Sequence, residues 1–277
     1  MNINDKKLDR AKMRGFALVF SVFPMLMSCA DKPVPAASPL SSAVDEHTHP
    51  LSLVQSQGLM GYGQVAIDGV REPLWNTALV YPMEFSMDGS LPAPLDFRGS
   101  VSYLWQEEGV NVLVEITDDV ISDQFEDPLD HFWADDVLEV FFDPDASGGP
   151  HRYSYQAFAY HIALDGAVVD GDERGEPIRL DEHLLMERRF LHENAEGSQT
   201  HLWELRVMPH TPNLKPFNLS KGMNIGMMVY YCDNDGTYER QHFMGDFPVL
   251  EVNDTRDRGW LDASTFRRFR LTGEFAM

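Results

Sequence analysis

One short segment in the middle of the chain, 137–143, constrains the fold more than any other. Its sequence is VLEVFFD, and a strand would place alternate residues on opposite faces. Both faces are apolar except for Glu139 and the terminal Asp143, so other layers of the protein must cover this strand on both sides. A carboxylate on a covered face is costly unless it has a partner. We therefore expect Glu139 to meet an internal partner, a metal ion or a ligand.

Alternating apolar residues predict further strands on either side of this segment. The clearest patterns lie at 110–117, 153–163, 202–207 and 223–232, and Asp-Gly and Asp-Pro turns punctuate the chain between them. Helical periodicity is scarce, and Leu180–His192 is the best helical prediction. The chain is therefore predicted to be all-β, an antiparallel β-sandwich of the jelly-roll type, with a short helical or loop insertion within Gly166–Ser198.

The first 28 residues have the pattern of a targeting segment, in which basic residues precede a short apolar stretch. The stretch ends in Leu-Met-Ser before Cys29 and resembles a bacterial lipoprotein signal. The resemblance implies cleavage before Cys29, lipid attachment to its thiol and, because Ala30 follows, placement at the outer membrane of the cell envelope. An ordinary secretory signal or a membrane anchor is the alternative. Residues 29–57, rich in Pro, Ala and Ser, are predicted to be a flexible tether, and 58–277 a single domain.

The chain carries a formal net charge of −22, although its targeting segment is basic. Such acidity disfavours nucleic acid and anionic membrane surfaces as partners, so membrane contact is expected through the lipid anchor alone. It is compatible with neutral or cationic ligands and with divalent cations. Cys232 has no other cysteine to pair with once Cys29 is lipidated, and it lies in an apolar run, so we expect a packed thiol.

The five tryptophans fall into two groups. Trp75, Trp105 and Trp203 adjoin apolar strand patterns and are predicted core residues. Trp133 and Trp260 instead lie in polar segments. A flat aromatic side chain in a polar loop can stack on the C–H face of a sugar ring, but it can equally close the end of a sandwich. The sequence pattern alone leaves both interpretations open.

The sequence lacks the familiar motifs for nucleophilic catalysis, phosphate binding and zinc proteolysis. Its many carboxylates leave a glycosidase-type acid pair open. Asp118, Asp143 and Asp145 lie at predicted strand ends, where carboxylates can hold a structural calcium ion or form ordinary turns. Residues 233–236, Asp-Asn-Asp-Gly, lack the full spacing of a calcium-binding loop, which favours a hairpin turn.

A series of short motifs resembles carbohydrate-binding module family 9. The motifs occur in order over about residues 60–273: Ile67-Asp68-Gly69 with Trp75 and Ala78; Leu104-Trp105 before the strand at 110–118; Trp133 to Asp143; Asn224-Ile225-Gly226 leading to Tyr231; and Trp260 to Phe266 with Phe269-Arg270-Leu271. The resemblance implies an antiparallel β-sandwich related to the DOMON group, in which no cofactor is required and calcium ions can be structural.

The resemblance also implies roles for individual residues. In the best-known branch of family 9, two tryptophans enclose the terminal sugar of cellulose or xylan fragments, and their positions match Trp133 and Trp260. A sugar-binding glutamate of that branch matches Glu139, and Gln156 matches a polar position on the next strand.

Two sugar-contacting positions of that branch differ here. Its arginine and asparagine fall near Phe158 and Tyr160, which cannot make the same hydrogen bonds. Arg240 or His161 could replace these contacts.

These observations predict a lipid-anchored, non-catalytic protein that binds an oligo- or polysaccharide and serves polysaccharide degradation or uptake. Trp133 and Trp260 would enclose the sugar, and Glu139, Gln156 and Arg240 would bind its hydroxyls. One alternative is a haem-binding electron-transfer module, because DOMON-related sandwiches include haem proteins and the chain offers many Met and His. Another is a glycoside-active enzyme with a site built by the insertion at 166–198.

Overall fold

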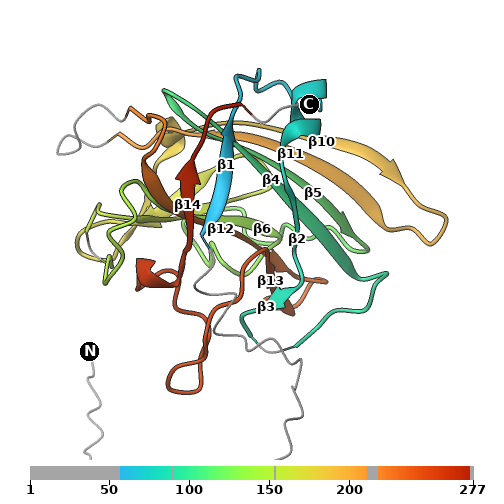
Figure 1. Ribbon diagram of the computed structural model, residues 1–277. Coiled ribbons are helices and arrows are strands. Elements are labelled where there is room, and N and C mark those ends of the chain that lie inside the picture. The colour runs from blue at the N-terminus through green and yellow to red at the C-terminus, as the bar shows by residue number, and fades with distance from the viewer. Residues whose placement is uncertain (1–56, 89, 153, 211–217, 275–277) are drawn as a thin grey trace, which may run out of the picture. The chain divides into compact units, whose positions relative to one another are not determined.

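The computed structural model describes residues 57–88, 90–152, 154–210 and 218–274, which belong to one compact unit (Figure 1). The predicted targeting segment, Cys29 and all of the tether except Gln57 lie outside the described residues. Within the described part of the chain, no helix is both long and apolar enough to cross a membrane.

Two packed sheets contain the fourteen strands of the described chain. Sheet A holds, in order, β14 (Arg267–Leu271), β12 (Asn224–Asp233), β6 (Val137–Asp143), β7 (Phe158–Ile162), β8 (Val168–Gly171) and β9 (Pro177–Arg179), with β13 (His242–Gly245) beside β12 and β3 (Phe85–Ser86) beside β13. Sheet B holds β10 (Leu184–Glu193), β11 (Gln199–Val207), β5 (Gly109–Asp118), β4 (Phe97–Gln106) and β1 (Gly58–Tyr62), with β2 (Val80–Pro82) beside β4.

Strand β1 joins the two sheets. Its first residues pair with β14 of sheet A, where Gly58 lies opposite Phe269, and its last residues pair with β4 of sheet B, where Gly61 lies opposite Leu104 (Figure 1). Both pairings are parallel, whereas the other strand pairs are antiparallel, so the antiparallel sandwich is confirmed with this one exception. A Cβ at Gly58 would lie 2.7 Å from the Phe269 ring, so the close approach of β1 requires glycine there.

The main core fills the space between the sheets, and smaller apolar clusters cover their outer faces. Trp105 and Trp203 are buried in the main core, and Trp75 is buried in the cluster outside sheet B. The Trp75 indole also donates a hydrogen bond to the buried Glu204 at 2.9 Å. The prediction that these three tryptophans are packing residues is therefore confirmed.

Strand β6 is covered on both faces, as its sequence predicts, and all seven of its residues are buried. Leu138, Val140 and Phe142 face the core between the sheets. Val137 and Phe141 face the outer cluster of sheet A, which includes residues of the loops after β13. Glu139 lies between Val137 and Phe141 on the same face of the strand and therefore points to the outer side of sheet A.

The helical prediction for Leu180–His192 is wrong. Apart from the short 3₁₀ helix η2 (Asp181–His183), this segment forms β10, which pairs with β11 from Leu184 opposite Val207 to Glu193 opposite Gln199. Pairing with a neighbouring strand outweighs a weak local helical pattern. The expected insertion at 166–198 is thus mainly the strands β8, β9 and β10. The other helices of the described chain are the 3₁₀ turns η1 (Pro73–Thr77) and η3 (Ala263–Thr265).

Candidate functional site

A cavity of about 800 Å³ opens on the outer side of sheet A, over Glu139. Trp133 and Trp260 both line it, although they come from loops far apart in the sequence. Their side chains are 37% and 39% exposed, unlike the buried Trp75, Trp105 and Trp203. The volume lies within the range of roughly 300–1,000 Å³ that is typical of small-molecule sites. The structure therefore brings together the two tryptophans that the sequence singles out.

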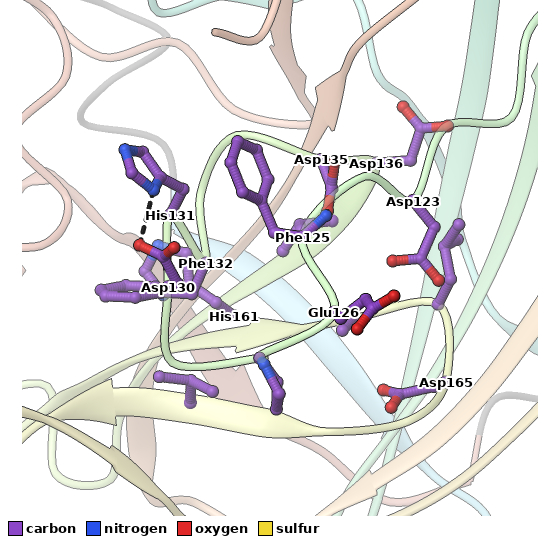
Figure 2. Close-up of a pocket in the computed structure, with 15 residues that line it drawn as sticks. Asp123, Phe125, Glu126, Asp130, His131, Phe132, Asp135, Asp136, His161 and Asp165 are labelled. Atoms are coloured by element: carbon purple, nitrogen blue, oxygen red, sulfur yellow. Dashed lines mark hydrogen bonds and ion pairs between the residues drawn. The ribbon is translucent and has the colours of Figure 1, made fainter. Parts of the chain in front are cut away.

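The loop between β5 and β6 positions Trp133 through a cluster of rings. Phe132 meets Trp133 edge to face at 4.9 Å, and Phe132 also packs edge to face on His161 of β7 at 4.7 Å. His131 lies 5.7 Å from Trp133 and has a positive φ of 48°, a conformation that is uncommon for a residue with a side chain. Its Nδ1 contacts Asp130 (Figure 2), and its Nε2 contacts the hydroxyl of Tyr238.

The loop between β13 and η3 carries Trp260 to the same cavity. Gly259 lies against Phe141 of β6, where a Cβ would come within 2.5 Å of the ring, so glycine permits this close contact. The buried His151 ring donates to the Gly259 carbonyl at 2.7 Å, and burial lowers the pKa of His151. The Arg152 guanidinium lies 4.5 Å from the centre of the Trp260 ring.

Glu139 has internal partners, which answers the question posed by its sequence. Its Oε1 accepts from His161 at 3.2 Å, from the Cys232 thiol at 3.1 Å and from Arg240 at 3.5 Å. Arg240 also donates to Asp257 at 2.6 Å. His161 lies beside Glu139 because the two residues are paired across β6 and β7. The prediction that Cys232 is a packed thiol is confirmed, since Cys232 is fully buried.

These contacts keep Glu139 and His161 charged. Burial would raise the pKa of Glu139, but His161 and Arg240 outweigh it and hold that pKa below its ordinary value. Burial would lower the pKa of His161, but Glu139 raises it above its ordinary value. The floor of the cavity is therefore a fixed array of alternating charges, His161, Glu139, Arg240 and Asp257.

The structure corrects the expectations for the strand next to Glu139. Gln156 is exposed in the turn before β7 rather than on the strand, and it does not line the cavity. Phe158 and Tyr160 are fully buried in the core between the sheets, where their rings stack at 5.0 Å. Alternation instead turns Ala159 and His161 toward the cavity. Phe158 and Tyr160 thus have no bearing on the polar side of the site.

The sequence patterns do not indicate several other residues that line the cavity. Asp257, Arg152 and Asp170 lie in segments whose local pattern gives no sign of a shared site. Asp170 accepts from the backbone N–H of Ala159 at 2.9 Å, and burial raises its pKa to about 6. The pairing of β7 with β6 and β8 brings Asp170 to the site, and two loops bring Arg152 and Asp257 there.

A smaller pocket of about 80 Å³ adjoins the cavity and shares Asp130, His131, Phe132 and His161 with it. Figure 2 shows Asp123, Glu126 and Asp165 on the side of this pocket away from His131. Burial and the nearby Asp135 raise the pKa of Asp123. The pocket therefore adds negative potential beside the cavity.

Three buried carboxylates, from Asp118, Asp136 and Asp233, have oxygens within 4.8 Å of one another. Asp233 is 1% exposed, and neither of its oxygens has a hydrogen-bond partner in the described chain. Burial and repulsion from neighbouring acids raise the pKa of Asp118 to about 7, of Asp136 to about 9 and of Asp233 to about 8. Hard oxygen ligands with unmet charge fit a calcium ion. Two further groups adjoin this carboxylate cluster: Asp233 also groups with Asp96 and His242, and Asp96 groups with Asp119 and Asp235.

Asp143 and Asp145, the other predicted calcium ligands, do not join this cluster. Asp143 ends β6 and accepts from the backbone N–H groups of Gly148 and Asp145, while Asp145 accepts from that of Ser147. These are the contacts of an ordinary turn, and a calcium ion at Asp143 and Asp145 stays a prediction. Residues 233–236 begin the longer connection between the antiparallel β12 and β13, which runs over 234–241, and Asp233 and Asp235 also belong to the carboxylate groups.

A β-sandwich with two half-exposed indoles over a mixed polar floor is typical of carbohydrate-binding modules. The family model described as "Carbohydrate family 9 binding domain-like" matches residues 67–274, and the chain therefore belongs to this family. The resemblance that the motifs indicate is thus confirmed. No curated protein matches the chain.

Solved structures confirm the fold. A carbohydrate-binding module of family 9 from Caldicellulosiruptor kristjanssonii, in complex with cellotriose, is 16% identical with a TM-score of 0.60, over 79% of this chain and 95% of that chain. A family 9 module from the same organism in complex with glucose is 15% identical with a TM-score of 0.56, over 79% of this chain and 97% of that chain.

Proposed function

We propose that the domain is a non-catalytic module that holds a sugar unit of an oligo- or polysaccharide between Trp133 and Trp260. The observation that supports this most is the position of these two indoles on one cavity over a charged floor. Family membership and the cellotriose and glucose complexes of the similar modules favour a neutral glucan as ligand. We expect a chain fragment rather than a flat polysaccharide surface, because the site is a cavity.

The charged floor would supply the hydrogen bonds to the sugar. The three contacts of Glu139 all go to Oε1, which leaves Oε2 to accept from a sugar hydroxyl. Arg240 is fixed by Glu139 and Asp257, so its remaining N–H groups are preorganised as donors. We leave Gln156 outside the proposed site because of its position in the turn before β7.

Titration calorimetry against glucose, cellotriose and xylan fragments tests this proposal. Trp133→Ala and Trp260→Ala should each weaken binding by roughly 1–3 kcal/mol, about 5- to 150-fold in Kd, because each removes a stacking surface. Phe190→Ala is the control, since Phe190 is an exposed aromatic on β10 and does not line the cavity. Unchanged affinity in both tryptophan variants would place the site elsewhere, and new reducing ends after incubation would show catalysis.

We further propose that Asp118, Asp136 and Asp233 hold a structural Ca²⁺. When bound, the ion would offset two of the three buried negative charges and join the ends of β5 and β12 to the segment before β6. The unpartnered oxygens of Asp233 are the observation that supports this. Calorimetric titration of metal-free protein with CaCl₂ tests it.

We propose that the protein is an outer-membrane lipoprotein anchored at Cys29, and that residues 29–57 form its tether. Its role in the cell would be in polysaccharide degradation or uptake. The lipoprotein-like signal supports this location. Metabolic labelling with a palmitate analogue should mark the wild-type protein and not Cys29→Ala.

A further inference from the structure

Asn234 occupies an unusual position between the carboxylate cluster and the cavity. Its side chain is fully buried, and it lies in the loop between β12 and β13, directly after Asp233. Its amide nitrogen Nδ2 donates to the carbonyls of Ala134 and of Thr237. Its Oδ1 accepts from the Thr237 backbone N–H at 2.7 Å, so both ends of the side chain are used.

The two loops that Asn234 joins both reach the cavity. Ala134 directly follows Trp133, and Thr237 lies three residues before Arg240. Gln124 adds a second link between the same loops, since its side chain donates to the Thr237 carbonyl at 2.7 Å. These contacts therefore join the loop that carries Trp133 to the loop that carries Arg240.

The same residue is also connected to the carboxylate cluster. The backbone N–H of Asn234 donates to Asp136 Oδ1 at 2.9 Å, and Asp136 Oδ2 accepts from the backbone N–H of Ser122 at 2.7 Å. Without a cation, the three buried carboxylates repel one another across this junction once they ionise. A bound divalent cation would remove the repulsion and hold Asp136 and Asp233, and with them both loops, in place.

We propose that Asn234 is a positioning residue that couples occupancy of the carboxylate cluster by a divalent cation to sugar binding between Trp133 and Trp260. The coupling rests on the proposed sugar and calcium sites. Calcium should raise the affinity for the sugar, and the sugar should raise the affinity for calcium by the same factor, because linkage is reciprocal. Couplings of this kind are typically about 5- to 150-fold.

Calorimetry with cellotriose in saturating CaCl₂ and in EDTA measures the coupling. The wild type should bind at least about fivefold more tightly with calcium. Asn234→Ser should bind calcium but lose this dependence, because the serine is too short to join the two loops. Asn194→Ser is the matched control, since Asn194 fixes its own turn between β10 and β11 through Oδ1 and should keep the full dependence. Equal calcium dependence in Asn234→Ser and wild type would overturn the proposal.

Hydrogen–deuterium exchange of the wild type provides a readout that requires neither the sugar nor a folded variant. Calcium should slow exchange in both 122–136 and 234–241, and leave the β10–β11 turn at 194–198 unchanged. Protection of both loops without binding of any glycan would refute the sugar site while upholding the link between cluster and loops. Protection of one loop alone, or no calcium binding, would refute the coupling itself.

Discussion

Glu139 shows how a single carboxylate can stay ionised inside a protein. Its neighbours are a histidine with a raised pKa, an arginine and a neutral thiol, and together they offset the cost of burial. The sequence pattern predicts that Glu139 is covered and needs a partner. It cannot show that His161 contacts Glu139 or that Asp257 holds Arg240, because those contacts depend on strand pairing and on a distant loop.

Arg240 is the residue whose loss should damage this array most. Arg240→Ala would leave Glu139 and Asp257 without their shared cation, and we expect a loss of about 3 kcal/mol in the free energy of unfolding, measured with urea. Arg179→Ala breaks the exposed pair with Asp181 and should cost less than about 1 kcal/mol. Similar losses in the two variants would contradict the view that the buried array is strongly coupled.

At the scale of elements, the covered strand β6 organises the site. Its inward residues are core, and its outward face carries Glu139 between the two tryptophan loops. The sequence predicts that strands exist and that three tryptophans are core residues, because both predictions rest on the local alternation of apolar and polar residues. The carboxylate cluster is different, because its members come from the ends of β5 and β12 and from the loop before β6. Nothing in their sequence spacing shows that these ends meet.

The carboxylate cluster predicts that one mutation changes thermal stability in opposite directions without and with calcium. In EDTA, at a pH where the cluster is ionised, Asp233→Asn should equal or exceed the wild type in thermal stability, because it removes one of three repelling charges. In excess CaCl₂ it should be less stable, since a ligand at 100 times its Kd stabilises by about 2.7 kcal/mol and the variant loses much of this. Asp143→Asn, at the other end of β6, should respond to calcium as the wild type does. Scanning calorimetry would decide, and a calcium effect unchanged in Asp233→Asn would exclude the cluster.

At the scale of the whole molecule, buried acids govern the response to pH. Asp118, Asp136, Asp170 and Asp233 have pKa values raised from 3.8 to between about 6 and about 9, chiefly by burial. The folded state therefore binds more protons than the unfolded state. The stability that these protons contribute is fully present below the unfolded pKa and is lost as the pH rises through the folded values.

Without calcium, the free energy of unfolding should therefore fall steadily from about pH 4 toward about pH 9. With calcium the fall should be smaller, because the cation replaces the protons of the cluster. Urea unfolding across this range, with EDTA or CaCl₂, measures both slopes. A metal-free protein that is most stable near the upper end of the range would show that these carboxylates are not buried as described.

The pairing of β1 with both sheets has a mechanical consequence. Its first residues are bound to β14, the last strand of the domain, and its final residues to β4. A pulling force applied at residue 57 therefore loads the C-terminal strand before it reaches sheet B. The domain cannot be unravelled one strand at a time from its N-terminal end, because releasing β1 also opens the junction between the sheets.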